Sequence, residues 1–326
     1  MSRAFSAGGA VAETVISTGQ HFDAQMSRVF FDELGLGAPD FDLGVRASLH
    51  GEMTGRMLKG VEKVLMEQRP DAVLVYGDTN STLAGALAGA KLQIPVVHCE
   101  AGMRTGNRTR PEEVNRIVVD HVSDLLLCST KAAVDNLARE GLAERAVHVG
   151  DVMHDVTLHA REQSIARSDI LERLDLGEGG FHLLTLHRSE NIDDVARFRE
   201  LLDYIGRLPD VGDVVFPVHP RTRKQMEAAG IDASRMRTID PLGYLDFHRL
   251  LSACSGVLTD SGGVQKEAYF HRKPCVTLRD ETEWTETVIH GWNRLWQGPP
   301  HGPRSDIADY GDAKMRLCRH LLPKAA

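Results

Sequence analysis

Short apolar runs alternate with longer amphipathic stretches along almost the whole chain. The strand-like runs, rich in valine, isoleucine and leucine, are 12–18, 71–77, 95–100, 125–130, 146–151, 182–188, 213–220, 256–263 and 274–280. The helical patterns between them include 51–68, 111–123, 131–140, 193–207 and 264–271. Because continuously apolar strands separated by helices are typical of parallel sheets that helices cover on both faces, the pattern predicts an α/β fold.

The length of 326 residues is enough for about two domains of ordinary size. We expect two doubly wound, Rossmann-like domains, the first over 1–160 and the second over 161–308. A C-terminal helix within 309–326 is expected to pack back on the first domain.

Charge and composition exclude several classes of protein. The chain has 38 Lys and Arg residues against 46 Asp and Glu residues, which gives a net charge of −8. This charge disfavours a protein that binds nucleic acid or anionic membranes, since either needs a basic face. No apolar run approaches the roughly 18–20 residues of a membrane span. The five cysteines are odd in number and form no CxxC pair or zinc spacing, so we expect a cytoplasmic protein without a metal site.

Polar residues follow most of the predicted strands. They occur at 77–79, 98–100, 187–188, 217–219 and 260–263. Ligands of open α/β sheets bind outside the carboxyl ends of the strands, so these residues are candidates for a site. If the strand ends of the two domains face each other, the site lies in an interdomain cleft.

Three acidic residues of the first half stand out. Asp78 follows an apolar strand and is either a functional acid or the N-cap of the next helix. Glu100 ends another apolar strand, where a carboxylate must be paired or perturbed. Glu112, Asn115 and Arg116 share one helix face, so they form either a surface ion pair or a carboxylate oriented by its arginine.

A glycine pair in the second half is a candidate phosphate site. Gly262 and Gly263 follow a strand and open a helix, and free N–H groups at such a terminus suit an anion. Ser261 could add a hydroxyl, and Glu267 lies one turn further along, within reach of a ribose. The alternative is a serine N-cap with a glycine-rich turn. No GxGxxG follows a strand and no GxxxxGK[ST] occurs, which disfavours nicotinamide and P-loop sites.

Two histidines follow strands in the same half. His187 ends one strand and His219 follows another, and each is either a general base or phosphate ligand, or a structural residue near a helix start. Acids on one domain and histidines on the other would provide the differently tuned groups that proton transfer at carbon requires.

Eight motifs, in order, resemble those of one known family. They are TGQHFD (18–23), GDTNST (77–82), HCEAGMRT (98–105), RPEEVNR (110–116), TLHRSEN (185–191), PVHP (217–220), DSGGVQKEA (260–268) and LRDETEW (278–284). Over about residues 12–315 the chain resembles the non-hydrolysing UDP-N-acetylglucosamine 2-epimerases, which implies a two-domain GT-B arrangement.

The resemblance also implies a reaction and a set of site residues. Such enzymes invert C2 of a UDP-2-acetamido sugar without a redox cofactor or metal, through proton abstraction, anti elimination of UDP and re-addition, and dimers are usual among them. The catalytic residues implied are Asp78, Glu100, Glu112 and His187. The substrate-binding residues implied are Gln20, His21, Arg116, His219, Phe247, Ser261, Gly262, Gly263 and Glu267. Among these, 261–263 are expected at the diphosphate, Glu267 at the ribose and the backbone around Phe247 at the uracil.

The chain also departs from the family pattern. Family members begin with a strand and a GTRPE-like loop, whereas this sequence starts near the end of the helix that follows, so the first strand is expected to be missing. The segments NRTRPEE and WTETVIHGWNRL resemble the branch that acts on UDP-2,3-diacetamido-2,3-dideoxy-glucuronate. A GT-B glycosyltransferase, a hydrolysing epimerase and a non-catalytic nucleotide-sugar binder remain as alternatives.

Overall fold

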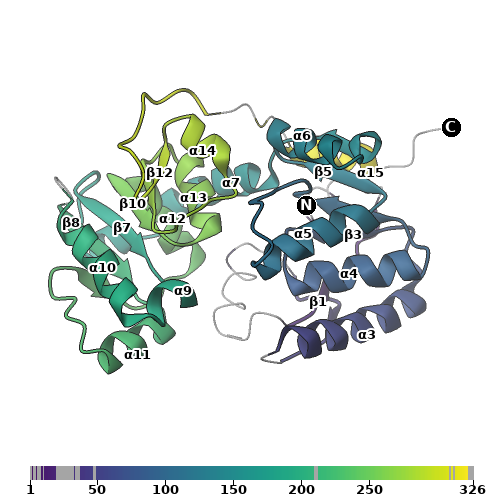
Figure 1. Ribbon diagram of the computed structural model, residues 1–326, viewed down its shortest axis with the longest axis horizontal. Helices are drawn as coiled ribbons and strands as arrows, with labels where there is room; N and C mark the ends of the chain where they lie inside the picture. The colour runs from purple at the N-terminus through teal and green to yellow at the C-terminus, as the bar shows by residue number, and fades with distance from the viewer. Residues whose placement is uncertain are drawn as a thin grey trace. The chain divides into compact units, whose positions relative to one another are not determined.

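The computed structural model forms two compact units (Figure 1). It describes residues 11–19, 37–46, 49–208, 212–307 and 313–321, and the single residues 2, 5, 9, 33 and 310. The first unit combines Met1–Asp155 with Asp309–Ala326, and the second is Val156–Ala308.

The first unit is built on parallel strands. Its described elements are β1 (Ile16–Ser17), β2 (Phe41–Asp42), α3 (His50–Gln68), β3 (Val73–Tyr76), α4 (Asn80–Lys91), β4 (Val96–Cys99), α5 (Pro111–Val122), β5 (Leu125–Cys128), α6 (Lys131–Arg139), η1 (Ala143–Arg145), β6 (Ala146–His148) and α15 (Ala313–Leu321). Strands β3, β4, β5 and β6 form one sheet in that order, and β1 pairs with β2. Helices α3, α4 and α5 of this unit lie side by side in that order (Figure 1).

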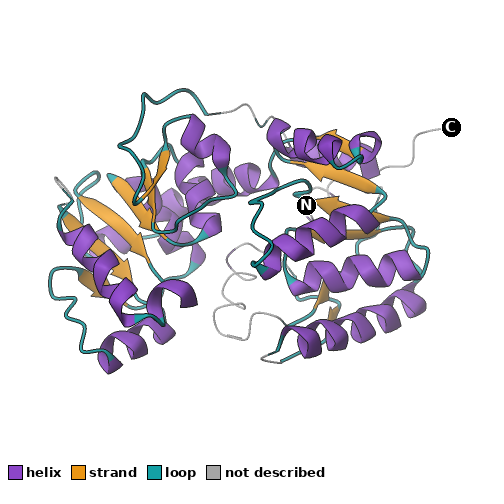
Figure 2. Ribbon diagram, in the orientation of Figure 1, coloured by secondary structure: helices purple, strands orange, loops and turns teal. Residues whose placement is uncertain are grey.

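The second unit has one six-stranded parallel sheet. Helix α7 (Val152–Arg167) contains the division between the units, and the remaining elements are α8 (Ile170–Arg173), β7 (Phe181–Thr185), α9 (Ser189–Ile192), α10 (Val195–Gly206), β8 (Asp213–Pro217), α11 (Pro220–Ala228), β9 (Arg237–Ile239), α12 (Tyr244–Ala253), β10 (Gly256–Thr259), α13 (Gly262–Phe270), β11 (Cys275–Thr277), α14 (Thr285–Ile289) and β12 (Asn293–Leu295). Helices and strands alternate along it (Figure 2).

The strand order of the second sheet is β12-β11-β10-β7-β8-β9. Counted within the unit this is the Rossmann order 3-2-1-4-5-6, in which the chain reverses direction across the sheet between β7 and β10. The loops after these two strands lead to opposite faces and leave a crevice at the carboxyl edge, where ligands of such sheets bind. The segments that begin at His187 and Asp260 therefore flank the switch point.

Alternating side chains of the central strands fill a core on each face of this sheet. Leu184 and Leu258 pack with α10 residues such as Phe198 in one apolar cluster, whereas Leu183 and Val257 belong to a second cluster. Because both faces bury apolar side chains, the strands read as continuous apolar runs in the sequence. The predicted α/β class with parallel sheets in two domains is confirmed.

The C-terminal helix α15 belongs to the first unit. Leu317 is buried in a cluster with Val97, Cys99 and Leu127 of the first sheet and with Val149, directly after β6. Within the part of the chain that the structure describes, no helix is long and apolar enough to cross a membrane.

Candidate active site

Asp78 lies at the carboxyl end of β3, one residue after Gly77. The N-cap of α4 is Thr79, whose hydroxyl accepts from the N–H of Thr82 at 3.4 Å, so the capping role considered for Asp78 belongs to its neighbour. The Asp78 carboxylate instead lies 2.5 Å from the guanidinium of Arg116 on α5. Asn115 donates to the Asp78 carbonyl at 2.9 Å, so two consecutive side chains of α5 hold this turn.

Arg116 is buried and bridges two carboxylates. Besides Asp78, it contacts Glu113 at 2.8 Å, one helical turn away at i, i+3 spacing. Glu113 also accepts from the N–H groups of Thr105 and Gly106 at 3.0 and 2.9 Å. Burial raises the pKa of Glu113, but these hydrogen bonds and Arg116 outweigh it, and the pKa lies below its usual value.

Within α5, the carboxylate that pairs with Arg116 is therefore Glu113, and the expectation that Glu112 fills this role is wrong. Pro111 begins α5, and Glu113, Arg116 and Asp120 are buried on one side of it, whereas Glu112 is only half-buried. The spacing i, i+3 joins a pair on an α-helix as readily as i, i+4, so the sequence alone did not separate the two glutamates. Whether Glu112 contributes to catalysis stays a prediction.

Glu100 follows β4 in an unusual backbone conformation. Its φ is +73°, in the left-handed region that non-glycine residues rarely adopt. The N–H groups of Glu100 and Ala101 both bond to the carbonyl of Leu127, which fixes the turn. The Glu100 carboxylate lies 3.9 Å from the position that a side chain on Gly77 would take, so it lies beside the Asp78 turn. Such strained residues cluster at functional sites.

In the second unit, His187 and Asp260 lie together at the switch point. Asp260, directly after β10, is fully buried and accepts from the N–H groups of His187 and Arg188 at 3.0 and 2.8 Å. It also accepts from the Asn191 amide at 3.2 Å. The Nδ1 atom of His187 lies 3.4 Å from the same carboxylate, and the ring is 45% exposed. The carboxylate orients the imidazole, which presents its other nitrogen for proton transfer or anion binding.

His219 lies close to His187, and their ring centroids are 6.5 Å apart. His219 is the N-cap of α11, and its Nδ1 accepts from the N–H of Arg221 at 3.2 Å. His219 is thus a structural residue at a helix start, one of the two alternatives that the sequence left open. Because Nδ1 is an acceptor there, the neutral ring carries its hydrogen on Nε2, which can donate to an oxygen.

The glycine pair opens α13 as predicted, and Ser261 is its N-cap. The Ser261 hydroxyl accepts from the N–H of Val264 at 3.5 Å. A side chain at Gly262 would meet the Glu283 carboxylate at 2.7 Å, so that carboxylate would have to shift to admit one. The N–H groups of the first turn have no acceptor within the helix, and they lie at the positive end of its dipole, next to the switch point.

The two residues expected at the nucleoside lie deeper in the second unit. Glu267 is on α13, and its carboxylate lies 3.6 Å from Nε2 of the buried His248. Phe247 packs against the apolar cluster beneath α12, and its N–H bonds to the Gly243 carbonyl at 3.0 Å. Gln20 and His21 lie outside the described residues.

Three buried residues without an individually predicted role complete the picture. Asp260, Glu113 and His98 all hold candidate site segments in place. Asp260 follows a strand, Glu113 lies in the first turn of a helix and His98 lies within a strand, and their position inside recognised motifs was the only available signal. Among the described residues, no group of three His, Cys, Asp or Glu could hold a metal.

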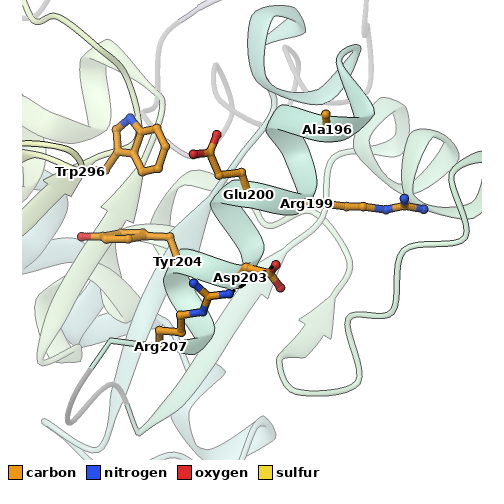
Figure 3. A pocket seen from close by; sticks show the side chains of 7 residues that line it. All are labelled: Ala196, Arg199, Glu200, Asp203, Tyr204, Arg207 and Trp296. Carbon is orange, nitrogen blue, oxygen red and sulfur yellow. Dashed lines mark ion pairs between the residues drawn. The ribbon is translucent and has the colours of Figure 1, made fainter.

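A separate surface pocket lies on α10 (Figure 3). It is lined by Ala196, Arg199, Glu200, Asp203, Tyr204, Arg207 and Trp296. None of these is a predicted site residue, and all except Trp296, which follows β12, belong to α10 or its C-cap.

Comparison with known proteins gives a consistent result. The family model described as UDP-N-acetylglucosamine 2-epimerase matches residues 3–303. The UDP-2,3-diacetamido-2,3-dideoxy-D-glucuronate 2-epimerase of Pseudomonas aeruginosa is 48% identical over 87% of this chain and 80% of its own length. The UDP-N-acetylglucosamine 2-epimerase of Methanocaldococcus jannaschii is 40% identical over 86% of this chain and 80% of its own.

The fold agrees as well. The crystal structure of the Methanocaldococcus jannaschii enzyme in complex with UDP-GlcNAc and UDP matches with a TM-score of 0.89 at 36% identity. That match covers 98% of this chain and 94% of the other. The epimerase from Neisseria meningitidis bound to UDP-GlcNAc matches with a TM-score of 0.82 at 26% identity, over 95% of this chain and 92% of the other.

Proposed function

Because the chain belongs to the UDP-N-acetylglucosamine 2-epimerase family, we propose that it inverts C2 of a UDP-2-acetamido sugar. The observation that carries this proposal is the cluster of carboxylates at the carboxyl edge of the first sheet. Asp78 and Glu100 lie beside the same turn, and Arg116 holds Asp78 in place. Removal of a proton from carbon needs a positioned carboxylate or histidine of this kind.

The proposed reaction proceeds by elimination and re-addition. A carboxylate of the Asp78, Glu100 and Glu112 set takes the C2 proton, the C1–O bond breaks, and C1 and C2 become a double bond as UDP leaves. UDP then adds back to C1 while a second acid delivers a proton to the opposite face of C2. Atoms and charge balance without an added oxidant or reductant.

The second unit supplies the nucleotide contacts in this proposal. The N-terminus of α13, with Ser261 and the glycine pair, takes the diphosphate, whose negative charge grows as the C1–O bond breaks. His187, held by Asp260, and His219 provide protons to the phosphate oxygens. Glu267 takes the ribose, and the start of α12 takes the uracil.

Deuterium exchange tests the proposal directly. UDP-GlcNAc incubated with the enzyme in heavy water, with no acceptor present, is expected to gain deuterium at C2 in both epimers, measured by NMR. Release of UDP with free N-acetylmannosamine would instead identify a hydrolysing epimerase. UDP binding without C2 exchange would identify a non-catalytic binder, and turnover only with an acceptor would identify a glycosyltransferase.

A second candidate substrate is UDP-2,3-diacetamido-2,3-dideoxy-glucuronate. The 48% identical relative from Pseudomonas aeruginosa, which carries that substrate in its name, favours it. Measuring kcat/KM for both sugar nucleotides with the same enzyme preparation separates the two. The substrate with at least a roughly tenfold higher kcat/KM, about 1.4 kcal/mol of transition-state binding, is the one the enzyme discriminates in favour of.

The assembly and location follow the family in our proposal. We expect a homodimer of this 35.9 kDa chain, which light scattering after gel filtration measures directly. A cytoplasmic location is supported by the cysteines, all five of which are free thiols.

A further inference from the structure

A histidine beneath the candidate acids has two hydrogen-bonding partners. His98 lies on β4, and its ring is fully buried. Its Nδ1 lies 2.7 Å from the Asp120 carboxylate on α5. Its Nε2 lies 2.8 Å from the carbonyl oxygen of Gly77.

Both partners can only accept a hydrogen bond. The Gly77 carbonyl has no proton to donate. The Asp120 carboxylate also pairs with Arg104 at 2.8 Å and accepts from the Gly102 N–H at 3.1 Å, and these two contacts, which do not depend on the charge of His98, favour its ionised form. Both ring nitrogens of His98 therefore donate, which only the protonated imidazolium does.

The ring joins three segments that carry proposed catalytic residues. Gly77, with a φ of +63°, immediately precedes Asp78. Glu100 lies two residues after His98, directly beyond the end of β4. Asp120 lies one helical turn beyond Arg116 on α5, and its second oxygen accepts from the N–H of Gly102 at 3.1 Å, just after the Glu100 turn.

We propose that His98 is a positioning residue for the epimerase reaction, and that its buried imidazolium fixes the turns of Asp78 and Glu100 against α5. The proposal rests on the proposed function. The positive charge also offsets the carboxylates gathered at this edge, which would otherwise repel one another. His98 has no need to touch the substrate for either effect.

The charge balance around the ring involves every neighbouring element. The negative groups are Asp78, Glu100, Glu113 and Asp120, and the positive ones are Arg104, Arg116 and His98. The thiols of Cys99 and Cys128 on β4 and β5 have raised pKa values, because burial disfavours the thiolate, so they stay neutral. Replacing His98 with a neutral side chain therefore raises the excess of negative over positive groups at this edge from one to two.

The variant His98→Gln keeps amide donors but removes the charge. We expect kcat to fall roughly 10- to 100-fold, the range for a misplaced catalytic group, while KM for the sugar nucleotide stays within about twofold. The acidic limb of the kcat profile should move to higher pH, because the carboxylates lose a nearby cation. Asp124→Asn is the matched control, since Asp124 accepts from the Val96 N–H at 2.8 Å, at the opposite end of β4.

Two further measurements keep the proposal falsifiable if His98→Gln folds poorly. Arg104→Gln removes the outer cation of the same network, at 2.8 Å from Asp120, and should shift the acidic limb in the same direction with a smaller loss of kcat. In the wild-type chain, nitrogen-15 NMR of the histidine side chains under the conditions of the assay should show both His98 nitrogens protonated. A neutral tautomer would overturn the proposal without any assay of activity.

The outcomes also separate this proposal from the proposed function. If the wild-type enzyme exchanges no C2 hydrogen, the proposed function fails, whereas the NMR result still decides the state of His98. If the wild type exchanges but His98→Gln matches Asp124→Asn in kcat and pH profile, His98 has only a structural role and the positioning proposal is wrong.

Discussion

At the scale of single residues, Glu100 combines a place in the candidate site with a strained backbone. Its carboxylate lies beside the Asp78 turn. Its φ of +73° lies in the left-handed region, for which Glu has no intrinsic preference. The surrounding hydrogen bonds impose that conformation, and they come from a strand 27 residues further along, at Leu127.

Because the backbone at Glu100 is strained, we expect the stability of a variant to depend on which residue replaces it. Glu100→Gly should be more stable than Glu100→Ala by about 1 kcal/mol, because glycine adopts a positive φ without the cost that a side chain brings. Both variants should lose C2 exchange. Urea unfolding of the two variants measures the difference, and equal free energies of unfolding would show that the turn is not strained.

The lowered pKa of Glu113 predicts a pH dependence of stability. A carboxyl whose pKa is lower in the folded than in the unfolded chain stabilises the fold above its ordinary value of 4.5. That contribution is lost as the pH falls below about 4.5 through the lower pKa of the folded state. Glu113→Gln should therefore be less stable than wild type at pH 7, and the gap should shrink on acidification.

Urea unfolding of both proteins between pH 7 and 3.5 tests this. The control is Glu172→Gln on the exposed surface of α8, which should leave the dependence unchanged. A constant gap between wild type and Glu113→Gln at all pH values would contradict the assignment.

At the scale of elements, the strongly apolar strands were predicted and the weak ones were not. The central strands β7 and β10 bury side chains on both faces, so their sequences are continuous apolar runs. Strands β9 and β12 are three residues long, lie at the two edges of the second sheet and include exposed or half-exposed positions. Such short edge strands leave no period in the sequence.

Helix boundaries depended on caps that the apolar pattern does not contain. The predicted helix 193–207 corresponds to α10, which begins only at Val195, because Asp194 caps it by accepting from the N–H groups of Ala196 and Arg197 at 2.9 and 3.2 Å. The predicted helix 264–271 begins two residues earlier, at Gly262, directly after its cap Ser261. Side-chain capping thus decided both starts.

Two glycines of one loop provide a matched test of packing between elements. Gly102 and Gly106 both have a positive φ, but an added Cβ at Gly102 would lie 2.4 Å from the Ala133 carbonyl of α6, whereas nothing lies within 4 Å at Gly106. Gly106→Ala should cost about 1 kcal/mol from its backbone alone. Gly102→Ala should cost at least about 2 kcal/mol more, because α6 must move.

Thermal unfolding of the two variants gives the comparison. Similar losses of stability at both positions would mean that α6 shifts to accommodate the added methyl group. The turn after Glu100 would then not be held in place by this helix.

At the scale of the whole molecule, an acidic chain can still present an anion site, because the attraction is local. The net charge of −8 disfavours attraction of an anion by the whole molecule, but the N-terminus of α13 and the histidines beside it concentrate donors at one edge of the second sheet. The recognisable motifs placed these residues in the right order. The buried partners Asp260 and His98 required the fold, since each bonds to segments remote in sequence.

Hydrogen exchange in the presence of UDP tests whether the nucleotide binds to the second unit. Saturating UDP should slow amide exchange most in β7, β10 and α13 of the second unit, and it should stabilise the protein by about 2.7 kcal/mol at 100 times its Kd. Protection of α3 and α4 equal to that of α13 would contradict the assignment of the nucleotide to the second unit.

The reversal of strand order between β7 and β10 has a consequence for how this family can diversify. A crevice made by connectivity survives the replacement of any one side chain, because the chain path, rather than a particular residue, opens it. The nucleotide position can then stay constant over evolution while loops exchange residues around the sugar. Relatives named for different sugars, at 48% and 40% identity to this chain, are what such a division between an inherited nucleotide site and a variable sugar site would produce.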